Sequence, residues 1–231
     1  MPVSISGPLI GARINGYFDK AVIHAADKPL LHPTTLIIVV KLPKSKEGKP
    51  AIVLVNKAPK VLRLKKGEQT DRIYYDCLGG HLEREDVEDC LHGKGCQPGD
   101  ADIELTEDMF LIAAKRELSE ELLLANNTPY GDKLFFFRQI EYGPADMPEG
   151  GRNHEISNVY IYVLPDNIQN VHSDMIMRDD YYRDGEGGRE HIVWDFAVKE
   201  FTVDELFEEY KLHPERFMDG ISRIVKPMAT H

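Results

Sequence analysis

One segment, TEDMFLIAAKRELSEELLLAN, constrains the fold of this chain more than any other, because its pattern is helical throughout. Thr106 is a good N-cap, and Glu107 and Asp108 follow it in the first turn, where the helix dipole favours negative charge. Asn126, Asn127 and Pro129 end the pattern. The segment therefore predicts one long helix with an apolar face. That face is formed by residues at helical spacing: Phe110, Ala113, Ala114 and Leu118.

Around this helix, short segments rich in β-branched and aromatic residues predict strands. They span 31–42, 51–57, 72–78, 133–143, 156–165 and 192–201. Two further helices are expected at 202–214 and 214–227, whereas the polar stretch 171–190 is expected to be irregular. Strands thus mix with a few helices and show no repeating βαβ pattern, which predicts an α+β fold with a mixed sheet.

The domain organisation follows from the same pattern. Residues 1–30 are expected to form an N-terminal extension or a hairpin, and residues 31–231 a single domain. The polar stretch at about 84–105 contains several glycines and a proline, so it is interpreted as a loop inserted into that domain.

Charge and composition exclude several classes of function. The net charge of −11 makes binding to long nucleic acids unfavourable, although a divalent cation could still attract a small phosphorylated ligand into one cleft. No run of 18 apolar residues is present, and the N-terminus shows no secretion signal, so a cytoplasmic protein without a membrane span is expected. Three cysteines are too few for a disulfide framework.

The chemically informative residues are three glutamates within the long helix. Glu117, Glu120 and Glu121 stand at positions i, i+3 and i+4, which places their carboxylates on one helix face. Three neighbouring anions repel one another, so a positive group is expected nearby. Arg116 is one candidate and a hard cation such as Mg²⁺ is another. A solvated helix face would carry the same residues, but the Gly79–Gly80 pair upstream favours a metal, because a backbone turn can offer it a carbonyl.

These two segments together resemble a known family. GGHLE, from Gly79 to Glu83, and AAKRELSEELLL, from Ala113 to Leu124, resemble the two halves of the Nudix box, G-x5-E-x7-R-E-U-x-E-E-x-G-U, where U is aliphatic. The resemblance extends from about Thr35 to Val225, and the box is its specific part. It implies a Nudix-type α/β/α sandwich around a mixed β-sheet.

The chain departs from the family pattern at three places. Gly80 and Arg116 are 36 positions apart, whereas the pattern has 14, so about 22 residues are inserted between the two halves. The early glutamate of the pattern falls at Asp108, and the glycine after the glutamate pair is Leu123.

The resemblance implies roles for individual residues. Glu120 and Glu121 would bind Mg²⁺, or Mn²⁺ in its place, with help from the Gly80 carbonyl. Glu117 would be a further metal ligand or would orient the attacking water, and Arg116 would hold a glutamate in place. Outside the box, Glu155 is a candidate ligand or base, although a surface residue at the start of a strand would look the same.

The function implied is a Mg²⁺-dependent hydrolase that cleaves the diphosphate linkage of a nucleoside diphosphate derivative, X-P-P-nucleoside. Candidates for the substrate are ADP-ribose, NADH, dinucleoside polyphosphates, nucleotide sugars and non-nucleotide diphosphates. The partner is thus a small phosphorylated molecule, and the family also suggests a homodimer.

Two alternatives stay open. Isopentenyl diphosphate isomerases belong to the same fold family, and His32, His81 and Glu155 have counterparts among their metal-binding residues. Against this, Cys77 lies about two residues before the place of their catalytic thiol, and Asn153 replaces a further metal carboxylate. The other alternative is a non-catalytic nucleotide sensor, although such proteins usually lose the box carboxylates that this chain keeps.

Three weaker signals have plain structural explanations as well. Cys90, His92 and Cys96 could bind zinc within the insertion, but their spacing is uncommon for zinc and incidental thiols are the simpler interpretation. The basic run 57–66 could contact phosphates or could be a solvated loop. Several aromatic residues could stack on a base or could belong to the core: Tyr74, Tyr75, Tyr181, Tyr182 and Trp194.

Overall fold

The structure is a computed structural model of the 231-residue chain. It describes residues 32–57, 73–83, 85–87, 105–125, 130, 133–146, 152–168, 170–185 and 188–229. The predicted extension or hairpin at 1–30 lies outside the described residues, and so does most of the predicted insertion. The zinc candidates Cys90, His92 and Cys96 lie outside them as well.

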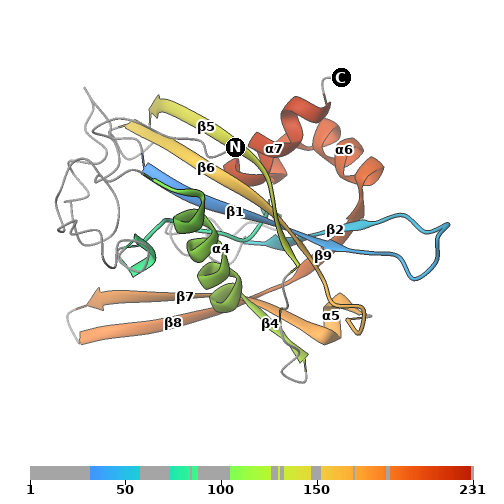
Figure 1. Cartoon of the computed structure of the whole chain (residues 1–231), viewed down its shortest axis with the longest axis horizontal. Coiled ribbons are helices and arrows are strands. Elements are labelled where there is room, and N and C mark those ends of the chain that lie inside the picture. The colour runs from blue at the N-terminus through green and yellow to red at the C-terminus, as the bar shows by residue number, and fades with distance from the viewer. Residues whose placement is uncertain are drawn as a thin grey trace. The chain divides into compact units, whose positions relative to one another are not determined.

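The chain divides into two compact units. Figure 1 labels their helices and strands. The first unit comprises Met1–Leu36, Gly79–Glu117 and Phe136–Tyr160. The second comprises Ile37–Leu78, Leu118–Phe135 and Ile161–His231. Several strands and the long helix contribute residues to both units, and each unit has buried apolar residues of its own.

The larger sheet is mixed, as predicted. Its strands pair in the order β3-β2-β1-β6-β5, and β9 also pairs with β2. Strand β2 runs antiparallel to β1, β3 and β9. By contrast, β1 and β6 run parallel, because side chains that meet across them keep a constant separation of 123 residues along the chain. The strands are β1 (His32–Lys41), β2 (Ala51–Asn56), β3 (Tyr75–Asp76), β5 (Leu134–Asp146), β6 (Arg152–Val163) and β9 (Val198–Thr202).

In the first unit, helix α4 (Glu107–Glu121) supplies the main apolar face, as its sequence pattern predicts. Burying these side chains contributes roughly 25 cal/mol for each Å² of apolar surface removed from water. The fully buried side chains from α4 are Met109, Phe110, Ala113 and Ala114, and β6 contributes Ile156, Val159 and Tyr160.

In the second unit, an aromatic cluster joins β3 to the C-terminal helices. The ring of Tyr75 lies 5.1 Å from that of Phe201 and 5.6 Å from that of Phe217. The predicted cap at Thr202 is confirmed, because Thr202 and Glu205 form a capping box at the start of α6. The helical elements here are α5 (Val171–Asp174), α6 (Val203–Leu212), η3 (Pro214–Arg216) and α7 (Asp219–Ala229).

Two sequence-based predictions are wrong. The long helix ends at Glu121, and the three leucines that follow form β4 (Leu122–Leu124). The stretch 171–190 is ordered as well: β7 (Met175–Gly185) and β8 (Gly188–Phe196) form a long hairpin, and β4 pairs with β7. In both places tertiary strand pairing overrides the local preference of the sequence.

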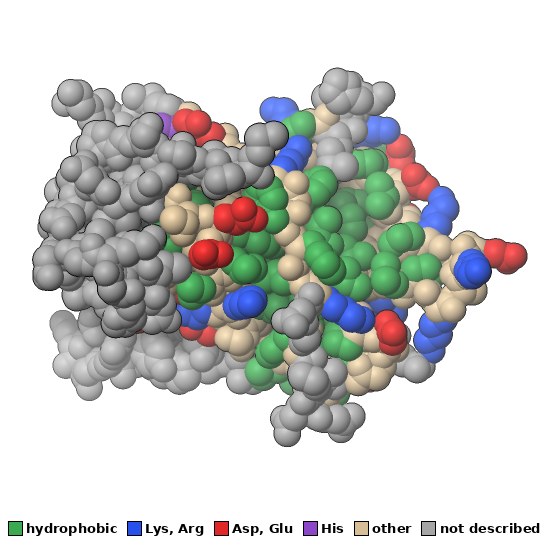
Figure 2. Space-filling view, in the orientation of Figure 1, with side chains coloured by type: hydrophobic (Ala, Val, Ile, Leu, Met, Phe, Trp, Pro, Cys, Tyr) green, Lys and Arg blue, Asp and Glu red, His purple; other side chains and the backbone are tan. Residues whose placement is uncertain are grey.

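Hydrophobic and charged side chains both reach the face seen in Figure 2. Single exposed apolar residues are common on soluble proteins, so exposure alone assigns no function here. No helix among the described residues has the length and apolar character needed to cross a membrane. Within the part of the chain that the structure describes, the exposed large hydrophobic residues are Leu42, Phe135, Phe136, Phe137, Ile176, Val203 and Leu212.

Candidate active site

The Gly79–Gly80 pair forms a tight turn beside the first strand. The backbone N–H of Thr35 donates to the Gly80 carbonyl at 2.8 Å. Gly79 has φ = +133°, and a Cβ at this position would lie 2.1 Å from the Thr35 carbonyl oxygen. Only glycine fits such a conformation and such a close approach. The turn thus fixes the Gly80 backbone against β1.

Helix α4 brings a carboxylate to this turn from the far side of the predicted insertion. A Cβ added to Gly80 would lie 2.3 Å from Glu117 Oε1 and 2.6 Å from its carboxyl carbon. Glu117 is only 9% exposed, so its carboxylate fills the space that a side chain at residue 80 would need. The two halves of the predicted motif therefore meet at Gly80 and Glu117, although 36 positions separate Gly80 from Arg116.

Arg116 holds this carboxylate in place. Its Nη1 donates to Glu117 Oε1 at 2.9 Å, and its Nη2 donates to the His81 carbonyl at 2.9 Å. The guanidinium also forms two parallel hydrogen bonds to Asp86, at 3.1 Å from Nε and 3.0 Å from Nη2. Such charge-assisted, bidentate pairs are among the strongest hydrogen bonds in proteins. Arg116 thus connects the glycine turn, the helix and Asp86.

Asp86 was not predicted from the sequence. It is 2% exposed, and its Oδ2 also accepts the backbone N–H of Glu83 at 2.7 Å. Residues 85–87 form a short helical turn within a stretch expected to be loop. An aspartate in a polar loop follows no helix or strand period, so the sequence does not indicate that Asp86 is buried. Its contact with Arg116 becomes visible only in the structure.

The other predicted ligands on α4 have different surroundings. Glu120 is exposed, and Glu121 is buried with its Oε1 at 3.6 Å from Lys57 Nζ. Lys57 is the first residue of the predicted basic run, and the rest of that run lies outside the described residues. Asp108, at the position of the early box glutamate, is exposed in the first turn of α4.

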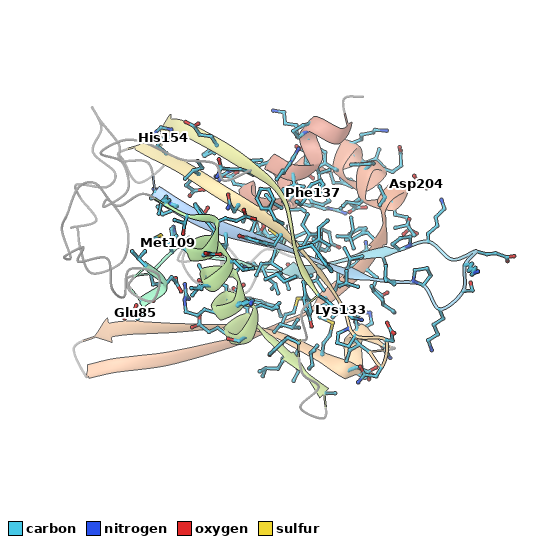
Figure 3. All side chains as sticks on the ribbon, viewed as in Figure 1. Glu85, Met109, Lys133, Phe137, His154 and Asp204 are labelled. Atoms are coloured by element: carbon cyan, nitrogen blue, oxygen red, sulfur yellow. The ribbon has the colours of Figure 1, made fainter. Side chains whose placement is uncertain are left out.

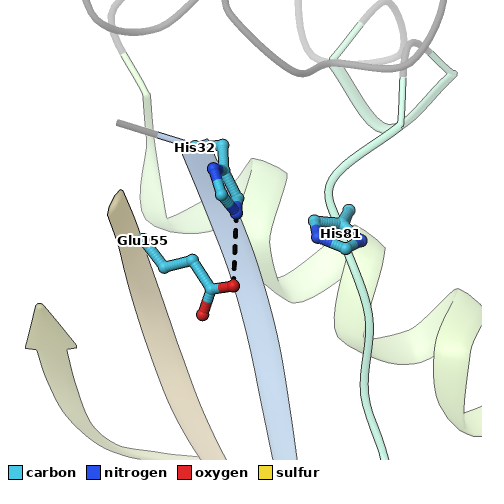
Figure 4. Close-up of side chains that lie close together, drawn as sticks. All are labelled: His32, His81 and Glu155. Carbon is cyan, nitrogen blue, oxygen red and sulfur yellow. Dashed lines mark hydrogen bonds and ion pairs between the residues drawn. The ribbon is translucent and has the colours of Figure 1, made fainter. Parts of the chain in front are cut away.

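A second group of potential metal ligands lies in the first unit (Figure 4). His32 Nε2 lies 3.2 Å from Glu155 Oε1, and the rings of His32 and His81 are 5.4 Å apart. Among the described residues, the potential ligand atoms of His32, His81 and Glu155 all fall within 4.8 Å of one another. Two imidazole nitrogens and one carboxylate oxygen suit Mn²⁺, Fe²⁺ or Zn²⁺ better than Mg²⁺.

The position of each ligand in this group follows from the fold. His32 starts β1 and Glu155 lies on the parallel neighbour β6, so the pairing of these strands brings the two side chains together. One pair further along, the hydroxyls of Thr34 and Ser157 are hydrogen-bonded to each other. His81 follows Gly80 directly, and a bridge between Thr34 and His81 keeps it beside β1. The glycine turn therefore serves both Glu117 and this His–His–Glu group.

Cys77 does not have the properties of a nucleophile. It is 3% exposed, and burial, with a smaller contribution from the negative charge of Asp76, raises the pKa of its thiol well above the ordinary value. A thiol that stays protonated at neutral pH is a poor nucleophile. Cys77 is thus a structural residue.

No protein-family model and no curated protein sequence matches the chain. Among solved structures, a Nudix hydrolase from Alicyclobacillus acidocaldarius is 12% identical, with 87% of this chain and 92% of that chain covered and a TM-score of 0.46. The fold is similar to that of Nudix hydrolases. A mutT/nudix family protein from Listeria innocua is 14% identical, covering 77% of this chain and 82% of its own, with a TM-score of 0.38.

A third similar structure is the Nudix domain of NrtR from Shewanella oneidensis, which was solved in complex with ADP-ribose. It is 9% identical, with 86% of this chain and 90% of that chain covered and a TM-score of 0.37.

Proposed function

We propose that this chain is a divalent-metal-dependent hydrolase that cleaves the diphosphate linkage of a nucleoside diphosphate derivative. The observation that carries the proposal is the buried Glu117 carboxylate, which lies against Gly80 and is hydrogen-bonded by Arg116. If the Glu117–Arg116 pair served only as a structural salt bridge, no glycine would be needed at residue 80 to make room for the Glu117 carboxylate.

The donor set of this site fits Mg²⁺ or Mn²⁺. Glu117 offers carboxylate oxygens, and the Gly80 carbonyl has a second lone pair besides the one that accepts the Thr35 N–H. Hard oxygen donors of this kind are the ones that Mg²⁺ prefers. Glu120 and Glu121 would be further ligands, because their helical spacing places them on the same face of α4 as Glu117.

When bound, the metal would neutralise the diphosphate and lower the pKa of an attacking water. Side chains of the protein hold the proposed metal ligand Glu117 in position. Arg116 fixes Glu117 Oε1, and Asp86 fixes Arg116 from the opposite side. Glu117 would then be a ligand or would orient the water, and Glu155 is the second candidate for the base.

The proposal is tested by a screen of diphosphate compounds in the presence of Mg²⁺ or Mn²⁺. The set contains ADP-ribose, NADH, a dinucleoside polyphosphate, a nucleotide sugar and a non-nucleotide diphosphate. We expect at least one nucleoside compound to be cleaved into two monophosphates and the Glu120→Gln variant to be slower. The matched control is Glu208→Gln, an exposed glutamate on α6 that pairs with Lys211. If wild type and Glu120→Gln cleave every compound equally, the metal assignment is wrong.

Asp86→Asn is expected to lower activity about tenfold, because groups that orient metal ligands typically contribute 10- to 100-fold. The amide keeps the size of the side chain but removes the charge that holds Arg116. The Mg²⁺ concentration for half-maximal rate should rise together with the loss of kcat, and this titration distinguishes a positioning role from a purely structural one. An unchanged Mg²⁺ dependence would contradict the role of Asp86.

A second candidate function is favoured by the His32–His81–Glu155 group, namely a metal-dependent isomerase acting on isopentenyl diphosphate. The burial of Cys77 argues against it, because a substrate does not reach a thiol whose residue is only 3% exposed. Incubation with isopentenyl diphosphate and Mn²⁺, followed by analysis for dimethylallyl diphosphate, decides between the two functions.

The same group predicts a measurable metal preference. His81→Gln should abolish one Mn²⁺-binding site in a titration followed by electron paramagnetic resonance, because it removes one of three converging donors. His213→Gln, at the end of α6, is the control histidine. Equal Mn²⁺ binding by wild type and His81→Gln would show that the three side chains hold no metal.

A further inference from the structure

Helix α4 ends in an electrostatically unfavourable way. Its last two residues are Glu120 and Glu121, and its last turn contains no basic residue. The C-terminal end of a helix carries partial negative charge, so carboxylates are disfavoured there. Figure 3 labels Met109 in the first turn of this helix, and Glu121 lies at the opposite end. Glu121 is also buried, and a buried carboxylate is costly unless a positive group compensates it.

The compensating charge comes from Lys57, the residue that follows strand β2. Its Nζ lies 3.6 Å from Glu121 Oε1, and the two side chains are only 10% and 8% exposed. Both residues belong to the second unit. As the first residue of the basic run, Lys57 was expected either to contact phosphates or to lie in a solvated loop. The structure places it instead in a buried ion pair with a proposed metal ligand.

The backbone at Lys57 is fixed by hydrogen bonds to two other segments. The Lys57 N–H donates to the Tyr74 carbonyl at 2.8 Å, and the Tyr74 N–H donates to the side-chain oxygen of Asn56 at 3.0 Å. The Asn56 N–H donates to the Ala197 carbonyl at 2.8 Å. A rigid strand end therefore delivers the ammonium group to Glu121, which is the kind of support that a precise site requires.

A second carboxylate near Lys57 has partners of its own. Burial raises the pKa of Asp76 on β3, and the positive charge of Lys57 opposes this rise. Asp76 Oδ1 also accepts the backbone N–H of Cys77 at 2.9 Å and that of Ile221 at 3.2 Å. Backbone groups of two segments thus hold Asp76, whereas Glu121 lies at the end of a helix whose last turn offers no cation.

Stability alone is a weak explanation for the Lys57–Glu121 pair. Removing two charges from water costs about as much as their attraction returns, and apolar replacements of buried ion pairs are often neutral or stabilising. Local features that cost stability are typical of functional sites. A carboxylate held in a fixed position inside the protein is useful where a metal is to bind it.

We propose that Lys57 is a positioning residue for the metal site, because its ammonium holds the Glu121 carboxylate in the place where it binds the metal. The proposal rests on the proposed function and adds a residue to the same site. Lys57 acts through Glu121 and not on the metal itself. Residues that orient metal ligands typically contribute 10- to 100-fold to metal affinity or activity.

Lys57→Met tests this role, since it removes the charge and keeps a long side chain. We expect the dissociation constant of Mn²⁺ and the Mg²⁺ concentration for half-maximal rate each to rise about tenfold. Lys57→Arg, which keeps the charge, should change both by less than about threefold. Mn²⁺ binding is followed by electron paramagnetic resonance in the His81→Gln background, so that the His–His–Glu group does not contribute.

Two results would overturn the proposal. Unchanged metal affinity in Lys57→Met would make the ion pair purely structural, and tighter binding would show that Lys57 mainly repels the metal. If Lys57→Met does not fold, Lys57→Gln removes the same charge and carries the same expectation. In a Glu121→Gln background, Lys57→Met should weaken Mn²⁺ binding no further, because the carboxylate through which it acts is gone.

The matched control is Lys41→Met. Lys41 on β1 also forms an ion pair across the sheet, with its Nζ 2.9 Å from Glu200 Oε2, and its loss changes the net charge equally. This variant should keep the metal affinity of wild type. Equal effects of Lys41→Met and Lys57→Met would show that the contact with Glu121 is not the cause, and would overturn the proposal.

The proposed function and the role of Lys57 fail in different ways. If wild type cleaves no diphosphate compound but Lys57→Met weakens Mn²⁺ binding, hydrolysis is wrong and the positioning of Glu121 stands. If wild type cleaves a compound and Lys57→Met keeps the metal affinity of wild type, only the role of Lys57 is wrong.

Discussion

Glu117→Gln should lower kcat/KM for the best diphosphate substrate by more than about 100-fold while the protein remains folded. Groups that only orient a metal ligand already contribute 10- to 100-fold, and Glu117 is proposed as the ligand itself or as the group that orients the water. A 100-fold loss corresponds to about 2.7 kcal/mol of transition-state stabilisation. The measurement is a steady-state assay at several Mg²⁺ concentrations.

The amide variant separates chemistry from folding. Glutamine keeps the shape of the side chain and can still accept the hydrogen bond from Arg116, whose charge remains paired with Asp86. The midpoint of thermal unfolding should therefore change little. A variant that unfolds at the wild-type temperature and keeps wild-type activity would remove Glu117 from the mechanism.

Substitution by alanine should affect mainly stability at Gly79 and mainly activity at Gly80. Gly79→Ala is expected to reduce the free energy of unfolding by about 3 kcal/mol, because a residue with a Cβ is strained at φ = +133° and its methyl group would overlap the Thr35 carbonyl. Backbone atoms on β1 cannot move aside without disturbing the strand. Chemical denaturation measures this loss directly.

Gly80→Ala should instead affect activity more than stability. Its methyl group would collide with the end of the Glu117 side chain, which can move at low cost to the fold but would leave its place on Arg116. We expect about a 10- to 100-fold loss of activity and a change in unfolding free energy of about 1 kcal/mol or less. Equal stability losses for the two variants would show that the carboxylate does not occupy the position described.

The parts of the fold that were predicted are those with a strong local pattern. Strands β1 and β2 are continuous runs of β-branched residues, and α4 has both a helical period and acidic residues in its first turn. The sequence of the β7–β8 hairpin has neither a run of β-branched residues nor a helical period. Its structure comes instead from pairing between two polar strands. The end of α4 was misjudged since leucines are good helix formers, and only the pairing of β4 with β7 makes Leu122–Leu124 a strand.

The same distinction applies to the site. The spacing of the glutamates and the glycine pair was readable in the sequence, and so were Arg116 and the histidines near the strands. Asp86 and the pairing of Lys57 with Glu121 were not, because each depends on segments that meet only in the folded chain.

The network around Arg116 also bears on how the long segment after His81 could change in evolution. Arg116 of α4 donates hydrogen bonds to the His81 carbonyl and to Asp86, at the start of this segment. The start of the segment is therefore held beside the helix in which the segment ends, whatever the length of chain between them. The entropic cost of closing a loop grows only with the logarithm of its length, about 0.6 kcal/mol for each doubling. Shortening or replacing residues 90–100 should thus leave the glycine turn in register with the helix, so the length of this region can change while Gly80 and Glu117 stay together.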